Sequence, residues 1–199
     1  MKLAVDCDEV LAGLLDKLII FHNDRYGTSL LKKDFLSYTF RDTIGGTFEE
    51  EHKKFTEFLH SHYFASVQPI PNSAETLRNL KRNGFEMEIV TARPPEIINS
   101  TLEWVKLHYR GIFSNVHFAR NPKLATNGKT KGEICLDIGA DYMIEDGPEY
   151  ALDVASKGIN VLLYDNPWNR NNTFLDNVKR VSSWKDIEKI VLTSSRVRE

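Results

Sequence analysis

Two patterns of apolar residues alternate along most of the chain: short continuous runs and longer stretches with helical spacing. The runs are typical of strands buried on both faces of a sheet. They occupy residues 2–6, 85–90, 142–145 and 161–165, with weaker runs at 115–119 and 178–182. Because strands that alternate with helices form βαβ units, the pattern predicts an α/β fold with a mostly parallel sheet covered by helices on both faces.

Residues that favour helix ends flank the stretches with helical spacing. Four helices with such signals are expected: residues 73–83 between Asn72 as N-cap and Gly84, residues 95–108 opened by Pro95, a helix between Pro148 and Gly158, and a last helix with a capping box of Ser183 and Asp186. Each of these helices adjoins a predicted strand, as the pattern of βαβ units requires.

The stretch 10–71 contains no strand pattern, although a crossover helix needs only a dozen or so residues. Apolar residues within 10–19 share one helical face, so a first helix is expected there, ending near Gly27. Thr47 and Glu50 have capping-box spacing ahead of a second helix. We therefore predict a small helical cap, rich in aromatic residues, inserted after the first strand.

This insertion divides the chain into two parts. The predicted cap comprises residues 13–71, and the predicted core comprises residues 1–12 and 72–199. Ligands of parallel α/β sheets bind beyond the carboxyl ends of the strands. We expect the cap to determine which substrate binds.

The composition narrows the class of protein. The 199 residues suffice for a substantial core, and 26 basic against 28 acidic residues offer no broad surface for a nucleic acid polymer. No apolar run approaches the ~20 residues that cross a bilayer, and Asp6 is incompatible with a signal peptide. Two cysteines suit a reducing compartment. We expect a cytoplasmic protein that binds neither membrane nor nucleic acid polymer.

Two carboxylates follow the first predicted strand. Side chains alternate along an extended chain, so Asp6 and Asp8 project together while Cys7 points away. Two neighbouring carboxylates repel each other and are costly to bury, and a divalent cation relieves both costs; oxygen ligands of this kind suit Mg²⁺. The alternative is a strand that simply runs into a polar loop.

Phosphate-binding candidates follow the strand 85–90. The Thr91 hydroxyl and the free N–H of Ala92 can bind a phosphate oxygen, and Arg93 adds a positive charge. The alternative is that Thr91 caps the turn into the next helix.

A lysine and two further acids complete the set of candidates. Lys131 opens a predicted helix, where a cation is unfavourable against the helix dipole. Pairing with Asp6 and with a phosphate would explain this placement, although Lys129, Lys123 or a solvated role are alternatives. Glu145 and Asp146 end another predicted strand, so Asp146 can complete a cation site or serve as an N-cap.

Four elements follow one another along the chain: the pair Asp6 and Asp8, then Thr91, then Lys131, then the pair Glu145 and Asp146. In this order they resemble the four motifs of the haloacid dehalogenase superfamily. The D-x-D-x-V-L start, the insertion after it, the K-x-E-I-C helix and the segment VLLYDNPWN at 161–169 are similar to the 5'(3')-deoxyribonucleotidase family, including bacterial-type nucleotidases. The resemblance covers nearly the whole chain. It implies a three-layer Rossmann-like core with a mostly parallel sheet and a helical cap.

The resemblance also implies a Mg²⁺-dependent phosphomonoester hydrolase with an aspartyl-phosphate intermediate. Asp6 would be the nucleophile, and Asp8 would protonate the leaving oxygen and then activate water. Thr91, Ala92 and Lys131 would bind the phosphoryl group. The metal would be held by Asp6, the Asp8 carbonyl and Asp146, with Glu145 acting through water.

Two departures from the family pattern leave roles open. Glu145-Asp146 stands where the family has two aspartates, and T-A-R-P replaces a Thr-Ser-Pro motif, so Arg93 is a candidate contact for a substrate group. Phe40 in the cap and Trp168 in the late loop are candidate substrate contacts. The alternative for the cap aromatics is packing within the cap itself.

The expected substrate is a small phosphate ester, with a deoxyribonucleoside monophosphate favoured. A phosphatase of sugar phosphates or other metabolites is the first alternative, and a nucleotide-binding protein without turnover is the second. An oligomer is compatible with the sequence.

Overall fold

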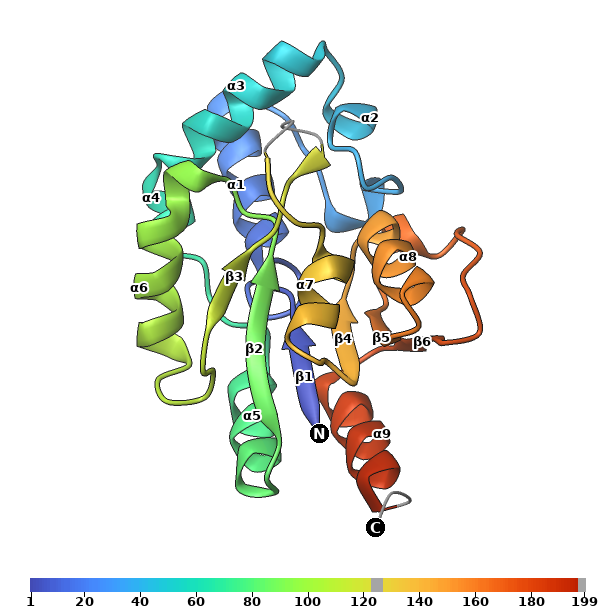
Figure 1. Ribbon diagram of the computed structural model, residues 1–199. Coiled ribbons are helices and arrows are strands. Elements are labelled where there is room, and N and C mark those ends of the chain that lie inside the picture. The colour runs from blue at the N-terminus through green and yellow to red at the C-terminus, as the bar shows by residue number, and fades with distance from the viewer. Residues whose placement is uncertain (123–126, 197–199) are drawn as a thin grey trace.

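The computed structural model describes residues 1–122 and 127–196 and contains a six-stranded parallel sheet (Figure 1). The strand order is β3-β2-β1-β4-β5-β6, and every neighbouring pair is parallel. The strands are β1 (Lys2–Val5), β2 (Glu86–Thr91), β3 (Val116–Phe118), β4 (Tyr142–Glu145), β5 (Asn160–Tyr164) and β6 (Val178–Val181). Each of the six apolar runs therefore forms a strand, and the predicted parallel sheet is confirmed.

Helices lie on both faces of this sheet. They are α1 (Leu14–Tyr26), α2 (Arg41–Ile44), α3 (Phe48–Leu59), α4 (His62–Ala65), α5 (Ser73–Arg82), α6 (Ile98–His108), α7 (Lys131–Asp137), α8 (Pro148–Ser156) and α9 (Trp184–Arg196), with short 3₁₀ turns η1 (Lys32–Asp34), η2 (Pro95–Ile97) and η4 (Pro167–Asn169). None of the described helices is both long and apolar enough to cross a bilayer.

Alternation along the buried strands produces two separate apolar layers. Leu3 and Val5 of β1 pack in a cluster with residues of α5, α6 and α9, whereas Ala4 packs in a cluster with residues of α7 and α8. All three side chains are fully buried. The predicted three-layer arrangement follows, because each face of the sheet must be covered by helices.

Two predicted helix starts differ from the structure. The Asn72 side chain makes no capping hydrogen bond, because the residue adopts a left-handed conformation with φ of 66°. At the start of α9, the Asp186 backbone N–H donates to Ser183 Oγ as predicted, but the Asp186 carboxylate accepts from the backbone of Ser182 and from the Ser183 hydroxyl. The boundaries of both helices still lie within a residue or two of their predicted positions.

The helical segment, defined here as residues 13–71, lies over the carboxyl ends of the strands (Figure 1). Its first helix begins at Leu14, so the prediction of a helix from Val10 is wrong. Leu11 and Ala12 instead donate their backbone N–H groups to the Cys7 carbonyl in a tight turn. The apolar residues of this turn are buried in the core, and that burial produced the misleading helical spacing.

The two ends of the helical segment lie side by side. The Gly13 N–H donates to the Gln68 carbonyl over 3.0 Å, and the Ile70 N–H donates to the Leu11 carbonyl over 2.7 Å. Between these ends, aromatic side chains of α1, α3 and α4 pack in a third apolar cluster. The predicted capping box of Thr47 and Glu50 opens α3. The segment is thus tied to the sheet at a narrow neck.

Candidate active site

Five polar side chains gather at the carboxyl edge of the three central strands. They come from the end of β1, the last residue of β2, the end of β4 and the first residue of α7: Asp6, Thr91, Glu145, Asp146 and Lys131. All five are at least 95% buried. The parallel topology explains their proximity, because β2 and β4 both pair with β1 and point the same way.

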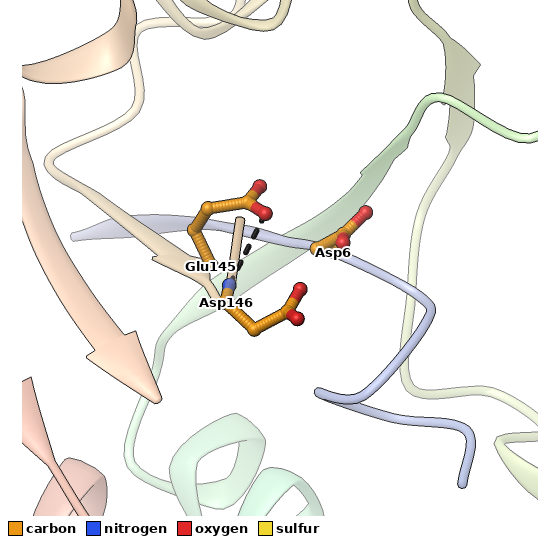
Figure 2. Close-up of side chains that lie close together, drawn as sticks. All are labelled: Asp6, Glu145 and Asp146. Carbon is orange, nitrogen blue, oxygen red and sulfur yellow. Dashed lines mark hydrogen bonds between the residues drawn. The ribbon is translucent and has the colours of Figure 1, made fainter. Parts of the chain in front are cut away.

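Three of these groups form an acidic cluster. Asp6, Glu145 and Asp146 each offer a carboxylate oxygen within 4.8 Å of the others, and Figure 2 shows the three side chains close together. Burial, reinforced by the charge of Glu145, raises the pKa of Asp6 to about 7 against the opposing effect of Lys131. The same two causes raise the pKa of Asp146 well above its usual value. Negative charge at this point is therefore only partly compensated by the protein.

Lys131 supplies the partial compensation. Its Nζ lies 2.7 Å from Asp6 Oδ1 and 2.8 Å from Glu145 Oε2, and it faces the Tyr150 ring at 4.3 Å. Burial lowers the pKa of Lys131, but the two carboxylates more than offset this and raise it above its usual value. The expected pairing of Lys131 with Asp6 is present. Of the two alternative lysines, Lys129 is exposed and pairs with Asp137, and Lys123 lies outside the described residues.

Glu145 bends back onto its own turn. Its Oε1 accepts hydrogen bonds from the backbone N–H groups of Asp146 (3.1 Å) and Gly147 (2.9 Å), and Figure 2 draws the first of these. Its Oε2 accepts from Lys131. Glu145 therefore fixes both the turn before α8 and the side chain of Lys131. The sequence did not reveal these direct contacts.

Asp146 is held by the loop after β5. Trp168 Nε1 donates to Asp146 Oδ2 over 3.0 Å, and Asn169 Nδ2 donates to the Asp146 carbonyl over 2.9 Å. Trp168 is buried and also lines the cavity, so its indole N–H faces the acidic cluster. Sequence reasoning named Trp168 only as a candidate substrate contact and missed Asn169, because no local pattern marks a contact between residues 22 or more positions apart.

Asp8 and Arg93 form a bidentate ion pair beside the cluster. Arg93 Nε donates to Asp8 Oδ2 over 3.0 Å, and its Nη2 donates to Oδ1 over 2.6 Å. Nη1 donates to Thr101 Oγ1, and the guanidinium lies over the rings of Phe64 and Trp104. In the substrate-free structure the guanidinium of Arg93 is therefore paired with Asp8, and a contact between Arg93 and a substrate group stays a prediction. The Asp8 carboxylate is half-exposed and is not part of the acidic cluster.

Thr91 and Ala92 border the same space. Thr91 is the last residue of β2, and its hydroxyl accepts from the Arg93 backbone N–H over 3.3 Å. Ala92 lines the cavity, and its carbonyl accepts from Asn121 Nδ2, a residue that the sequence did not single out. Thr91, Ala92 and Lys131 therefore line one cavity, and their role in phosphate binding stays a prediction.

A cavity of about 200 Å³ extends from these groups to the helical segment. Its floor includes most of the polar groups described above: Asp6, Asp8, Thr91, Arg93, Lys131 and Asp146. Its roof is formed by the helical segment, mainly by the apolar and aromatic side chains of Leu14, Leu15, Phe35, Phe40, Phe48, Phe55 and Leu59. The polar residues Ser37, Tyr38, Glu51 and His52 of the same segment also line it. Phe40 packs against the rings of Phe35 and Phe55, and because it also lines the cavity, a contact with substrate stays a prediction.

Comparisons with known proteins agree with this architecture. The family model described as 5' nucleotidase, deoxy (pyrimidine), cytosolic type C protein matches residues 1–197. The 5'(3')-deoxyribonucleotidase of Bacillus subtilis is 27% identical over 194 residues, which cover 96% of this chain and 98% of that protein.

Solved structures extend the comparison to the fold. A haloacid dehalogenase-like family hydrolase from Streptococcus pneumoniae has a TM-score of 0.63 at 13% identity, with 96% of this chain and 97% of that chain covered. A superfamily hydrolase from Geobacter sulfurreducens has a TM-score of 0.62 at 16% identity, with 96% and 95% covered.

Proposed function

Because the chain belongs to the family of the cytosolic type C 5' deoxynucleotidases, which hydrolyse phosphoric monoesters, we propose that it is a Mg²⁺-dependent 5'(3')-deoxyribonucleotidase with an aspartyl-phosphate intermediate. Its α/β fold is that of the haloacid dehalogenase superfamily. The observation that carries the proposal is the meeting of Asp6, Lys131 and Asp146 at one edge of the sheet.

The acidic cluster fits a magnesium ion. Asp6 and Asp146 offer oxygen ligands at the spacing that one cation spans, their charge exceeds what Lys131 neutralises, and carboxylate oxygens suit Mg²⁺. The backbone carbonyl of Asp8 is the third protein ligand in this proposal. When bound, the ion would offset the charge of Asp6 and of an incoming phosphate dianion.

Asp6 is the proposed nucleophile. Lys131 holds Asp6 Oδ1, which leaves Oδ2 free to attack phosphorus while the bond to the ester oxygen breaks. Thr91 and Ala92 would bind the phosphoryl oxygens from one side and Lys131 from the other, so the charge of the transferring group is balanced by fixed donors.

Asp8 is the proposed acid and base. It would donate a proton to the leaving ester oxygen and then accept one from the water that hydrolyses the aspartyl-phosphate, which releases phosphate and restores Asp6. The bidentate contact with Arg93 supports this role, because it fixes the direction of the Asp8 carboxylate at the cavity wall.

Residues 13–71 are the proposed cap, joined to a core of residues 1–12 and 72–199. The narrow neck and the separate apolar cluster support this division. A nucleobase would stack on the aromatic roof, which explains why so polar a floor is matched with so apolar a roof. The name of the Bacillus subtilis relative supports a deoxyribonucleotide over a sugar phosphate.

A cytoplasmic location is part of the proposal. Cys7 and Cys135 are both buried free thiols, as suits a reducing compartment.

Phosphate release from a panel of deoxyribonucleotides, ribonucleotides and sugar phosphates, measured with Mg²⁺ and with excess chelator, tests the proposal. We expect the highest kcat/KM for deoxyribonucleoside monophosphates and no turnover in chelator. Preference for a sugar phosphate would refute the substrate, and turnover in chelator would refute the metal. Ligand binding without turnover would refute the enzymatic role altogether.

A further inference from the structure

A continuous set of contacts connects the helical segment to Asp146. Lys32, in η1, places its Nζ 2.7 Å from Glu9 Oε2 and 5.7 Å from the centre of the Trp168 ring. Trp168 Nε1 in turn donates to Asp146 Oδ2 over 3.0 Å. Lys32 is thus the member of this set that belongs to the helical segment, while Glu9, Trp168 and Asp146 belong to the sheet side of the cavity.

The Trp168 contact fixes one oxygen of Asp146. An indole N–H is a donor only, so it engages a single carboxylate oxygen and leaves the other free. Figure 2 shows the Asp146 carboxylate directed toward Asp6. Asn169, in the same η4 turn, holds the Asp146 backbone. Outer partners that orient a carboxylate in this way raise metal affinity about 10- to 100-fold in other proteins.

The Lys32 contacts fix Trp168 in turn. An ammonium group over an indole face is attracted by the ring quadrupole, so Lys32 favours the ring orientation in which Nε1 reaches Asp146. Glu9 anchors the ammonium, and its other oxygen accepts from the Leu15 N–H at the start of α1. Glu9 directly follows Asp8 and has φ of 55°, a left-handed conformation that costs energy in a non-glycine residue. These contacts compensate for that cost.

We propose that Lys32 and Trp168 are positioning residues for Asp146, and that they couple the placement of the helical segment to cation binding. The inference rests on the proposed function, because it takes Asp146 as a ligand of the cation. Coupling between two equilibria is reciprocal. If Lys32 increases the affinity for the cation by some free energy, a bound cation should stabilise the observed placement of the η1 region by the same free energy.

Calorimetric titration of the substrate-free protein with Mg²⁺ tests this inference. Trp168→Phe removes the N–H and keeps an aromatic ring, and we expect the Mg²⁺ dissociation constant to rise about tenfold or more. Lys32→Met should raise it several-fold. Since both act through one contact, the double variant should bind no more weakly than the weaker single variant, whereas independent effects would multiply. Lys32→Arg keeps the charge for Glu9 and the ring and should restore affinity.

Two matched controls separate positioning from general damage. Lys33→Met removes the same charge from the same turn at an exposed position, and Trp184→Phe removes an indole N–H that donates over 3.0 Å to the Val10 carbonyl. Neither should change the Mg²⁺ dissociation constant. In wild-type protein, Mg²⁺ should slow amide hydrogen exchange around η1, and in Lys32→Met this protection should be lost.

Unchanged Mg²⁺ affinity in both Trp168→Phe and Lys32→Met would overturn the inference, as would multiplicative effects in the double variant. If Trp168→Phe does not fold, Lys32→Met and Lys32→Arg still decide the matter, because Lys32 is half-exposed. Absence of Mg²⁺ binding by the wild-type protein would refute the proposed metal site itself, and this result is distinct from binding that the variants leave unaltered.

Discussion

The floor and the roof of the cavity are built in opposite ways. The floor groups come from the ends of adjacent parallel strands and the start of α7, and the hydrogen bonds and ion pairs described above fix them. The roof side chains come from α1, α3 and the stretch between them, Phe40 packs against the rings of Phe35 and Phe55, and Phe48 is 42% exposed. The difference fits the proposal that the floor groups carry out the chemistry while the roof side chains govern the choice of substrate. Four predictions test this division.

Replacement of the proposed nucleophile should have the largest effect. In Asp6→Asn the side chain keeps its shape but is a far weaker nucleophile, so we expect kcat to fall by at least about 10⁴-fold. The melting temperature should stay the same or rise, because burial and neighbouring acids disfavour the charged form of Asp6. Asp176→Asn, at an exposed position, is the matched control. Substantial turnover by Asp6→Asn would show that the floor does not act through this residue.

Removal of the floor cation should damage both activity and stability. Lys131→Met leaves Asp6 and Glu145 buried without their partner, so we expect unfolding in urea to cost about 3 kcal/mol less and kcat to fall by about 10³-fold. Added Mg²⁺ should restore part of the stability. Lys129→Met removes an exposed lysine and should change the free energy of unfolding by less than ~0.5 kcal/mol. Equal effects of the two variants would contradict the ion-pair argument.

The Asp8–Arg93 pair lies between floor and roof and should have an intermediate effect. Arg93→Met frees the Asp8 carboxylate, so we expect kcat for a nucleotide to fall by about 10²-fold. The loss should be much smaller for p-nitrophenyl phosphate, whose leaving group scarcely needs a proton. If both substrates lose the same factor, Arg93 serves some purpose other than orienting the acid.

A roof variant should have the smallest and most selective effect. Phe48→Ala removes a half-exposed ring from the cavity mouth, and we expect KM for a deoxyribonucleotide to rise about fivefold, which corresponds to roughly 1 kcal/mol of stacking. The inhibition constant of inorganic phosphate, which would bind only to the floor, should not change. Leu36→Ala, an exposed neighbour that does not line the cavity, is the control. A large fall in kcat would mean that the roof takes part in the chemistry.

Sequence predicted the floor better than the contacts that hold it. The strands were found because buried parallel strands are short apolar runs. Their parallel arrangement brings Asp6, Thr91 and Asp146 to the same edge of the sheet, whatever the conformation of the connecting loops. The partners of Arg93 and Trp168 were not found, since a side-chain contact across 85 or 22 positions leaves no local pattern. The false start of α1 at Val10 has another cause. A turn that buries its apolar residues in the core mimics one turn of a helix.

The neck between residues 11–13 and 68–70 is a position at which the helical segment can be exchanged for another. Because two backbone hydrogen bonds close it, whatever chain lies beyond is attached at a fixed spacing, independent of its own length or sequence. A chimaera that carries a foreign helical unit between Gly13 and Gln68 should keep the strand register and the nucleophile in place. Divergence of this unit can therefore change what is recognised without rebuilding what reacts, as long as the contact of Lys32 with Trp168 is kept.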